Sequence, residues 1–359
     1  MCSRKFKEYN HDIKVECWKT DYKAKRIYER KISGITFKIF PAYNIKRLGN
    51  YSPRLLKHIR KEVRKNKKVI FNIESFRHLL FYSVALKLKN YPLVVQNNGE
   101  APAVYKATIS KGIKKLYYLA QIPFEKKAFK NVDLMYILDN HIREFLPHNE
   151  TVIKQQTLGV MPEIFVPLNK KAARRLLNLD PNKKYLLYVG RLNYTKRADL
   201  LIDVFNELKK ERQDIELIIA GTKKDDPLIH SAKMAGIKIY GLIMHTEMYK
   251  YLSAADVYIL SKYTKADPFK GIGLLPMEGL LCDTPVVGES LYNFPEENRN
   301  AVGFAVSKRD QIKEAILKII DGKITFNNLR EIAIKHYSWE NIIYRTAHDY
   351  ENIINKYWS

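Results

Sequence analysis

Two short stretches of this chain combine residue types that can bind an anionic ligand. The first, YVGRLNYTKR (188–197), follows an apolar run and contains Gly190, Arg191 and Lys196. A helix start offers free N–H groups, an arginine a two-pronged fork of donors and a lysine a point charge, so together they suit a diphosphate. The alternative interpretation is an ordinary solvated basic loop.

The second stretch, KGIGLLPMEGLLCDTPVV (270–287), places a carboxylate directly behind a glycine-rich turn. Gly271 and Gly273 allow the backbone to approach a ligand closely, and the amides of a helix that begins at Leu274 can hold a phosphate. Glu278 lies one helical turn after Leu274, and an ionised carboxylate accepts hydrogen bonds from a vicinal diol such as ribose. The alternative for Glu278 is an exposed helix glutamate.

The elements that must position these residues alternate regularly in the second half of the chain. Short apolar runs bounded by turns predict buried strands, and the residues between them keep helical spacing. Strands are predicted at 184–190, 215–221, 237–241, 256–260 and 284–288, and helices around 200–208 and at 246–255, 274–281 and 307–320. This alternation predicts a parallel sheet covered on both faces, with ligands at the carboxyl ends of its strands.

The first half repeats the pattern less regularly. Strands are predicted at 13–18, 35–40, 68–73 and 92–97, helices at 53–66 and 76–89, closing stretches at 133–138 and 152–160, and a linker at 161–171. A chain of 359 residues is long for one core. We therefore expect an α/β protein with two doubly wound, Rossmann-like domains, 1–165 and 166–335, that face each other across a cleft.

Taken in order, the motifs resemble the C-terminal domain of retaining GT-B glycosyltransferases of family 4, the glycosyl transferases group 1. That family has a G-R-x4-K element, which Gly190, Arg191 and Lys196 match. It also has an E-x7-E element followed by a G-x-P-V-V strand, which GIGLLPMEGLLCDTPVV (271–287) matches except for the first glutamate. Three further stretches are similar to its strand before the donor loop, its interdomain connection and its terminal helix: YLSAADVYILSK (251–262), VIKQQTLGVMPEIFVP (152–167) and YSWENIIYRTAHDYENII (337–354).

The resemblance implies a GT-B fold and an enzyme that moves a sugar from a nucleotide-diphospho-sugar to an acceptor with retention of configuration. Arg191 and Lys196 would hold the donor diphosphate and stabilise its leaving charge, and Glu278 would hold the ribose; these three form the expected catalytic set. The expected donor-binding set is Gly190, Arg191, Lys196, Gly271, Ile272, Gly273, Leu274, Leu275 and Glu278. The terminal helix, 336–359, would cross back to the first, acceptor-side domain.

The resemblance also implies which ligands to expect. The chain contains no Asp-x-Asp motif, in keeping with the metal-independent scheme of this fold, so neither a metal nor a cofactor is expected. The donor is expected to be UDP- or GDP-linked. The acceptor is expected to be lipid-linked, a polysaccharide or another glycan.

Three departures from the family's pattern keep a second interpretation open. Lys270 stands where the family has the first glutamate of its E-x7-E element, and Asn98 stands where a histidine near the sugar is usual, so both are candidate sugar contacts of a different kind. The family's first strand and its glycine-rich loop have no visible counterpart before HDIKVECW (11–18). The alternative is therefore a sugar-nucleotide or glycan-binding protein of the same fold that has lost catalysis.

Positive charge is concentrated in the first half of the chain. The net charge is +25; residues 1–170 contain 34 Lys and Arg against 14 Asp and Glu, and the remainder contains 29 against 24. Such an imbalance indicates an anionic partner. The cationic face of SPRLLKHIRKEVRKNKK (52–68), together with KGIKK (111–115), suits an anionic membrane surface. Tyr117, Tyr118 and Phe124 are then either interfacial residues or ordinary core or surface residues.

Other features of the sequence narrow the class of protein. Nucleic acid is not the expected partner, because no recognised binding motif or aromatic stacking platform accompanies the charge. No apolar run approaches the roughly 18 residues of a membrane span, and the first residues lack the apolar core of a signal peptide. Cys2, Cys17 and Cys282 lack metal-ligand spacing and are interpreted as free thiols, so we expect a cytoplasmic protein. The basic first half adds the expectation that this protein is peripheral on the inner face of the membrane.

Overall fold

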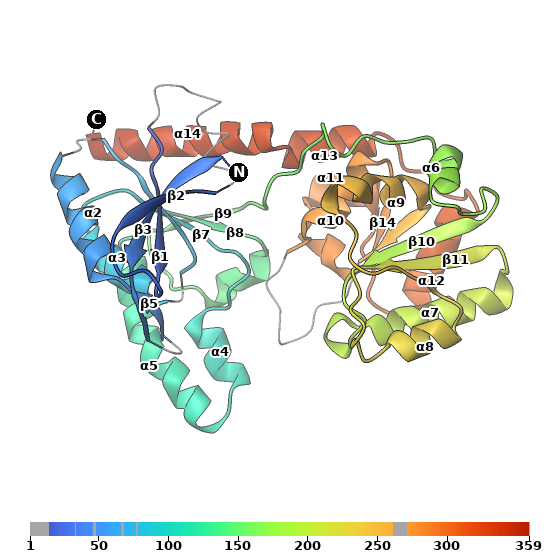
Figure 1. The fold of residues 1–359 in the computed structure, drawn as a ribbon, viewed down its shortest axis with the longest axis horizontal. Helices are drawn as coiled ribbons and strands as arrows, with labels where there is room; N and C mark the ends of the chain where they lie inside the picture. Colours follow the sequence, from blue (N-terminus) through green and yellow to red (C-terminus); the bar gives the residue numbers. More distant parts are fainter. Residues whose placement is uncertain are drawn as a thin grey trace. The chain divides into compact units, whose positions relative to one another are not determined.

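The computed structural model describes residues 14–32, 34–45, 48–65, 68–76, 78–260 and 271–358. The chain divides into two compact units (Figure 1). Unit 1 comprises Met1–Gln156 with Ile342–Ser359, and unit 2 comprises Thr157–Asn341. Both are α/β.

Unit 2 is built on one parallel sheet of six strands. They are β10 (Lys184–Val189), β11 (Ile215–Ala220), β12 (Lys238–Ile239), β13 (Val257–Ile259), β14 (Val286–Val287) and β15 (Gly303–Phe304). Their order is β12-β11-β10-β13-β14-β15, and every neighbouring pair is parallel. The chain order reverses between β10 and β13, and in such sheets the crevice at this switch point is where ligands bind.

Helices cover both faces of this sheet, as the alternation predicts. They are α6 (Lys170–Leu176), α7 (Ala198–Glu211), α8 (Ile229–Met234), α9 (Met248–Ala254), α10 (Leu274–Leu281), α11 (Glu296–Val302), α12 (Arg309–Ile320) and α13 (Leu329–Tyr337). Tyr185 and Leu187 of β10 pack into a core with α9, α10 and α13, whereas Leu186 and Tyr188 pack on the other face with α7 and α12. The period of two along β10 thus separates two cores.

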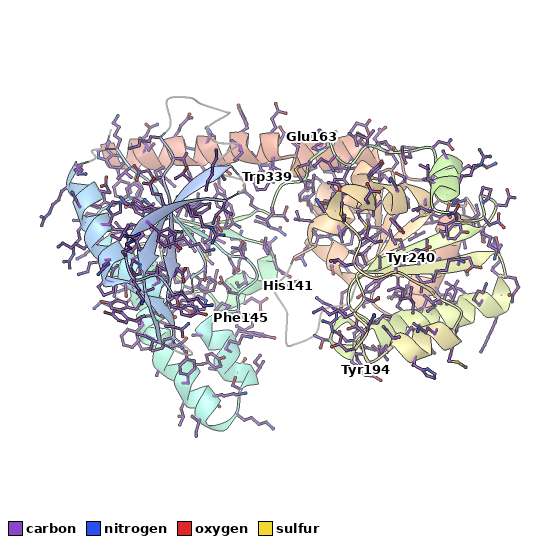
Figure 2. All side chains as sticks on the ribbon, in the orientation of Figure 1. His141, Phe145, Glu163, Tyr194, Tyr240 and Trp339 are labelled. Carbon is purple, nitrogen blue, oxygen red and sulfur yellow. The ribbon has the colours of Figure 1, made fainter. Side chains whose placement is uncertain are left out.

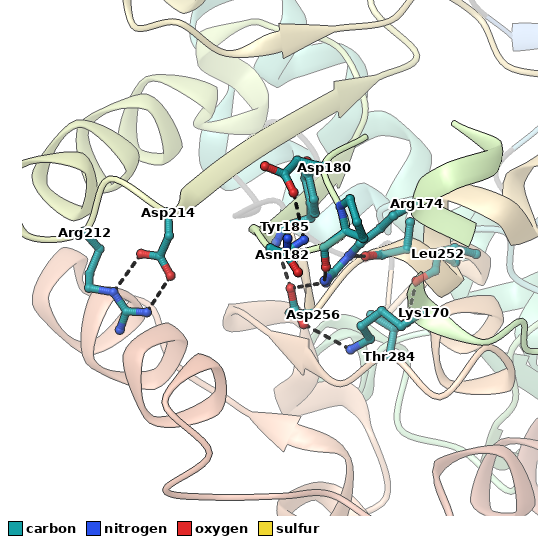
Figure 3. Close-up of polar contacts among 12 residues, drawn as sticks. Lys170, Arg174, Asp180, Asn182, Tyr185, Arg212, Asp214, Leu252, Asp256 and Thr284 are labelled. Carbon is teal, nitrogen blue, oxygen red and sulfur yellow. Dashed lines mark hydrogen bonds and ion pairs between the residues drawn. The ribbon is translucent and has the colours of Figure 1, made fainter. Parts of the chain in front are cut away.

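A buried ion cluster holds the amino ends of β10 and β13 together (Figure 3). Asp256 Oδ2 accepts hydrogen bonds from Arg174 Nη2 at 2.6 Å and from the Tyr185 N–H at 2.7 Å, while Lys170 Nζ lies 3.2 Å from Oδ1. Removing one partner from a buried pair costs about 3–5 kcal/mol, so this cluster is a structural clamp. It lies at the end of the sheet opposite to the carboxyl ends, and therefore away from the expected site.

Unit 1 contains a second, smaller parallel sheet. Its strands are β6 (Phe71–Glu74), β7 (Leu93–Gln96), β8 (Leu134–Ile137) and β9 (Val152–Gln155), in that order. Beside it, β1 (Cys17–Asp21) pairs in parallel with β3 (Ile35–Pro41), β2 (Tyr28–Ile32) pairs with β3 in antiparallel fashion, and β4 (Tyr43–Ile45) forms a hairpin with β5 (Gly49–Tyr51). The strand predicted at 13–18 begins at Cys17 instead, and β2, β4 and β5 were not predicted, because their short polar sequences show no clear period.

The helices of unit 1 are α2 (Pro53–Lys65), α3 (Leu79–Lys87), α4 (Ala103–Ile109), α5 (Gly112–Phe129) and α14 (Trp339–Trp358). In α2 the residues Leu55, Leu56 and Ile59 are buried, which confirms that the apolar face of this helix packs on its own domain. The helices α4 and α5 were not predicted from the sequence. In the described parts of the chain, no helix combines the length and apolarity that crossing a bilayer requires.

The helix α14 packs on unit 1 along its C-terminal part. Asp349 accepts a hydrogen bond from the Tyr136 hydroxyl at 2.8 Å and forms an ion pair with Lys154. Ile353 packs with Val94 and Leu134 of the parallel sheet. The helix starts in unit 2 at Trp339, labelled in Figure 2.

Candidate functional site

The carboxyl end of β10 is shaped by a glycine that no other residue can replace without movement. The Gly190 N–H donates to the Ala220 carbonyl at 2.8 Å, and a Cβ on Gly190 would lie 2.7 Å from the Tyr188 hydroxyl. That hydroxyl donates to the Arg191 carbonyl at 3.3 Å. The backbone that presents Arg191 is therefore fixed from both sides.

The Arg191 side chain is oriented by a buried carboxylate. Its Nε pairs with Oδ1 of Asp226, whose side chain is fully buried, and Oδ2 of Asp226 accepts the N–H groups of Leu192 and Lys223, each at 3.0 Å. Burial by itself would raise the pKa of Asp226, but the bonds from Lys223, Arg191 and Leu192 outweigh it and hold this pKa below its usual range. Asp226 thus stays charged and holds Arg191 through Nε, which leaves the two Nη nitrogens for another ligand; Asp225 lies 3.9 Å from Nη2.

Lys196 ends a short 3-10 helix, η3 (Tyr194–Lys196), just before α7. The Asn193 side chain accepts the Lys196 N–H at 3.0 Å, and Arg197 follows in the left-handed region at φ 51°. Lys196 lines a small cavity with Tyr188 and Glu289. It therefore lies, like Arg191, at the carboxyl edge of the unit 2 sheet.

The glycine-rich turn before α10 adopts a conformation that favours glycine. Gly271 has φ 63°, and Gly273, the N-cap of α10, has φ 82° and ψ 174°. Ile272 between them is buried in the core, and Leu274 and Leu275 pack partly against it, so the turn is anchored through its apolar side chains. The N-cap Gly273 has no side chain to cap α10, so among the described residues the first amides of this helix are available to an anion.

Glu278 is buried rather than exposed, which excludes the alternative of an ordinary surface glutamate. The residue is 2% exposed, and its Oε1 lies 2.8 Å from Nε2 of His245. Its Oε2 is buried with no hydrogen-bond partner among the described residues. Burial raises the pKa of Glu278, and the His245 contact acts in the opposite direction. A buried acceptor without a donor costs about 1–3 kcal/mol, so a ligand hydroxyl at Oε2 would be favourable.

His245 and Asp226 were not identified from the sequence. His245 begins a 3-10 helix, η4 (His245–Glu247), is half exposed, and meets the Phe165 ring edge-on at a centroid distance of 5.0 Å. The sequence contained a weak signal for both residues. Asp226 follows β11 and His245 follows β12, and the loops at the carboxyl ends of neighbouring parallel strands gather at one edge of the sheet. Which loop side chain turns inward depends on tertiary packing.

The two candidate sugar contacts, Asn98 and Lys270, stay predictions. Asn98 is exposed and belongs to unit 1; the neighbouring Asn97 organises that turn, since its Oδ1 accepts the N–H groups of Gly99 and Glu100 at 2.5 and 2.8 Å. Lys270 lies outside the described residues. Arg191, Lys196, the glycine-rich turn and Glu278 are all in unit 2, at the carboxyl edge of its sheet.

Unit 1 has a cavity of its own at the carboxyl ends of β1 and β6. It measures about 270 Å³, close to the lower end of the range of about 300–1,000 Å³ typical of ligand sites. Ser75 in its wall has φ 108°, unusual for a residue with a side chain, and its buried hydroxyl has no hydrogen-bond partner among the described residues. Strain and an unsatisfied polar group at a cavity are features of ligand sites. The lining residues are Thr20, Gly49, Asn50, Ile73, Glu74, Ser75, His78, Leu80 and Phe81.

Comparison with known proteins gives a family match for the second half of the chain. Residues 169–336 match the family described as glycosyl transferases group 1. A D-inositol 3-phosphate glycosyltransferase of Segniliparus rotundus is 25% identical over 164 residues, covering 43% of this chain and 35% of that protein. A GDP-mannose-dependent monoacylated alpha-(1-6)-phosphatidylinositol monomannoside mannosyltransferase of Corynebacterium glutamicum is 24% identical over 185 residues, covering 48% and 49%. The match thus spans half or less of these relatives' length.

Solved structures match nearly the whole chain. Sucrose-phosphate synthase from Thermosynechococcus elongatus aligns with a TM-score of 0.66 and 17% identity, over 95% of this chain and 89% of that one. Anabaena HepE in complex with UDP aligns with a TM-score of 0.65 and 14% identity, over 88% and 86%. These similarities confirm the expected fold class: the chain has the GT-B fold, with two Rossmann-like α/β units.

Proposed function

We propose that this protein is a glycosyltransferase that transfers a sugar, with retention, from a nucleotide-diphospho-sugar to a glycan or lipid-linked acceptor. The observation that carries the proposal is the state of Glu278. This buried carboxylate follows the glycine N-cap of α10 by about one turn, and its Oε2 lacks a donor among the described residues. A vicinal diol supplies donors to such a carboxylate, while the first amides of α10 receive the phosphate that follows the ribose.

In this proposal the donor diphosphate is bound by three kinds of positive group. The first amides of α10 bind phosphate oxygens, Arg191 donates from its Nη nitrogens, and Lys196 adds a point charge. Because Asp226 already fixes Arg191, little reorganisation is needed as negative charge develops on the departing diphosphate. Leaving-group stabilisation by these groups requires neither a bound metal nor a cofactor, as we expect for this chain.

The donor is proposed to be UDP- or GDP-linked. Two observations support this choice: HepE, which shares the fold, is described in complex with UDP-glucose, and one curated relative is named as GDP-mannose-dependent. Both are statements about those proteins. For this chain the base contacts are proposed to come from the loops at 221–223 and 241–244.

The acceptor is proposed to bind to unit 1, and the cavity between β1 and β6 is our candidate for its hydroxyl groups. Glu74, Asn50 and His78 supply acceptors and donors there, and the unsatisfied Ser75 hydroxyl adds another. A lipid-linked acceptor is supported by the name of the Corynebacterium glutamicum relative, which acts on a phosphatidylinositol mannoside. We accordingly propose a protein that works peripherally at the inner face of the membrane, with the cationic face of α2 toward anionic lipid.

A thermal-shift screen across UDP-, GDP- and ADP-sugars, followed by a transfer assay, tests the proposal. A true donor at about 100 times its dissociation constant stabilises the fold by about 2.7 kcal/mol, which is a readily measured shift. The proposal predicts one stabilising nucleotide class and release of its nucleotide when acceptor is added. Absence of any shift would contradict donor binding. A shift without hydrolysis or transfer would instead favour the binding protein that Lys270 and Asn98 suggest as the alternative.

A further inference from the structure

One helix of unit 1 exposes a continuous apolar stripe. In α5, Ile113 is 79% exposed, Leu116 66% and Phe124 58%, and Leu119 beside them is 42% exposed. The spacing from Ile113 to Leu116 to Ala120 to Phe124 is three, four and four residues, which places these side chains on one face of the helix. Single exposed apolar residues are normal, but a stripe along about three turns marks an interaction surface.

This stripe is not the face by which α5 packs on its domain. The buried residues of the helix are Gln121, Glu125, Ala128 and Phe129, at other positions of the helical period. Phe129 joins a buried aromatic cluster with Phe76 and Phe81. Packing inside unit 1 is therefore satisfied, and the stripe is left without a protein partner among the described residues.

The exposed charged residues of α5 and of its N-cap are all positive. The exposed lysines of this segment are Lys111, Lys114, Lys115, Lys126 and Lys127. Its single acidic residue, Glu125, is buried, and both of its oxygens accept the Ala103 N–H at 3.2 Å. Exposed apolar side chains flanked by lysines can enter a membrane interface while the lysines contact the headgroups.

We propose that α5 docks this protein on an anionic lipid bilayer, with Ile113, Leu116 and Phe124 inserted at the boundary of the acyl chains and the flanking lysines at the phosphate headgroups. A second copy of the chain is the less suitable occupant, because two such faces would bring like charges together. The proposal deepens the peripheral membrane location of the proposed function. It differs from the interaction expected of α2, whose apolar residues are buried and which offers charge alone.

The first test measures binding of the full chain to vesicles of phosphatidylglycerol mixed with phosphatidylcholine. The double variant Ile113→Ser/Leu116→Ser should bind at least about tenfold more weakly, since two apolar side chains no longer enter the lipid. The matched control is Leu176→Ser/Met234→Ser, which removes two exposed apolar side chains from unit 2 and should bind like wild type. Equal binding of the α5 variant and wild type would overturn the proposal.

The second test places a reporter on the stripe. Phe124→Trp should shift its fluorescence to the blue on anionic vesicles and be quenched by brominated acyl chains, whereas Tyr292→Trp, on an exposed site of unit 2, should show neither effect. Vesicle binding without quenching at position 124 would mean that charge alone attaches the protein. Sedimentation without lipid tests the other possible occupant of the stripe, a second copy of the chain. If wild type self-associates and Ile113→Ser/Leu116→Ser does not, the assignment of the stripe to lipid is overturned.

These outcomes are separable from failure of the proposed function. None of the variants touches Arg191, Lys196 or Glu278, so the thermal shift by a nucleotide is an independent readout. Vesicle binding through α5 without any nucleotide shift would keep the membrane surface and reject the donor site. The reverse result would reject the membrane surface and keep the donor site.

Discussion

Among individual residues, Glu278 carries most of the functional argument. It is buried, this burial raises its pKa, and its Oε1 has a partner in His245. Buried ionisable groups of this kind are retained where a ligand needs them, at a cost to the stability of the free protein. Two predictions follow from this balance between binding and stability.

The first is that Glu278→Gln stabilises the fold in a pH-dependent way. Because burial raises the pKa of Glu278 above its ordinary 4.5, the folded state holds this proton more tightly than the unfolded chain does. Stability from this group is present below the ordinary pKa and is lost as the pH rises through the folded pKa. The melting temperature of Glu278→Gln relative to wild type should therefore increase between about pH 4 and pH 7. A difference that stays constant over this range would show that Glu278 is not strained by burial.

The second is that His245 positions Glu278 for the ribose. His245→Ala removes the donor at Oε1, so affinity for the preferred nucleoside monophosphate should fall by about tenfold or more, as expected for a hydrogen bond to a charged group. His245→Gln keeps a donor and should retain most of the affinity. His230→Ala, on the exposed surface of α8, is the matched control and should behave as wild type. Full affinity in His245→Ala, measured by calorimetry, would leave His245 without this role.

Among the elements, the start of α10 is where the proposed function depends most on a particular backbone conformation. Gly273 lies at φ 82° and ψ 174°, a region that is almost exclusive to glycine. Among the described residues, a Cβ there would meet Pro276 Cδ at 3.9 Å and nothing nearer. Gly273→Ala should therefore cost about 1–3 kcal/mol by strain and displace the amides for which we propose phosphate binding. Gly236→Ala is the control, since Gly236 has φ 71°, open space around it and no place in the site.

Both glycine variants should have a lower melting temperature than wild type. Only Gly273→Ala should also bind the nucleotide more weakly at temperatures where the variant is fully folded. Calorimetry below the melting temperature separates the two effects. Equal nucleotide affinity in both variants would mean that the α10 amides do not contact the ligand.

The elements also show how far the sequence could predict this molecule. The predicted helix 274–281 has the observed bounds of α10, because a glycine turn, a proline in the first turn and a strand signal limit it on both sides. The helix α5 was missed, because its apolar residues lie on an exposed face as well as a buried one and blur the helical period. Arg191 and Glu278 could be chosen from the motifs, but their partners Asp226 and His245 are more than 30 positions away and depend on packing.

At the scale of the whole molecule, the positive charge is concentrated in the first half of the chain, and the fold itself does not require this imbalance. The exposed cations of α2, Arg60, Lys61, Arg64 and Lys65, lie opposite its buried apolar residues. Reversing these four charges should weaken binding to anionic vesicles, because each cation near such a surface contributes about 1 kcal/mol. Added salt should weaken wild-type binding in the same direction. Nucleotide binding, which we propose for unit 2, should not change.

The control reverses four exposed cations of unit 2, Lys171, Arg175, Lys233 and Lys238, which changes the net charge equally. If both variants lose vesicle binding alike, net charge alone attracts the protein and the α2 surface has no special role. If wild type ignores anionic vesicles at low salt, the peripheral membrane location is wrong.

The most direct test of the central claim is calorimetry of nucleotide binding by Arg191→Ala, Lys196→Ala and Glu278→Gln. The ligands are whichever of UDP and GDP stabilises wild type, and its monophosphate, after circular dichroism has confirmed folding. The two cation variants should bind the diphosphate about ten- to a hundredfold more weakly, because a hydrogen bond to a charged group contributes about 1.5–3 kcal/mol. Glu278→Gln should weaken the binding of both ligands, because both contain the ribose. Wild-type affinity in all three variants would contradict a nucleotide-diphosphate site at the carboxyl edge of this sheet.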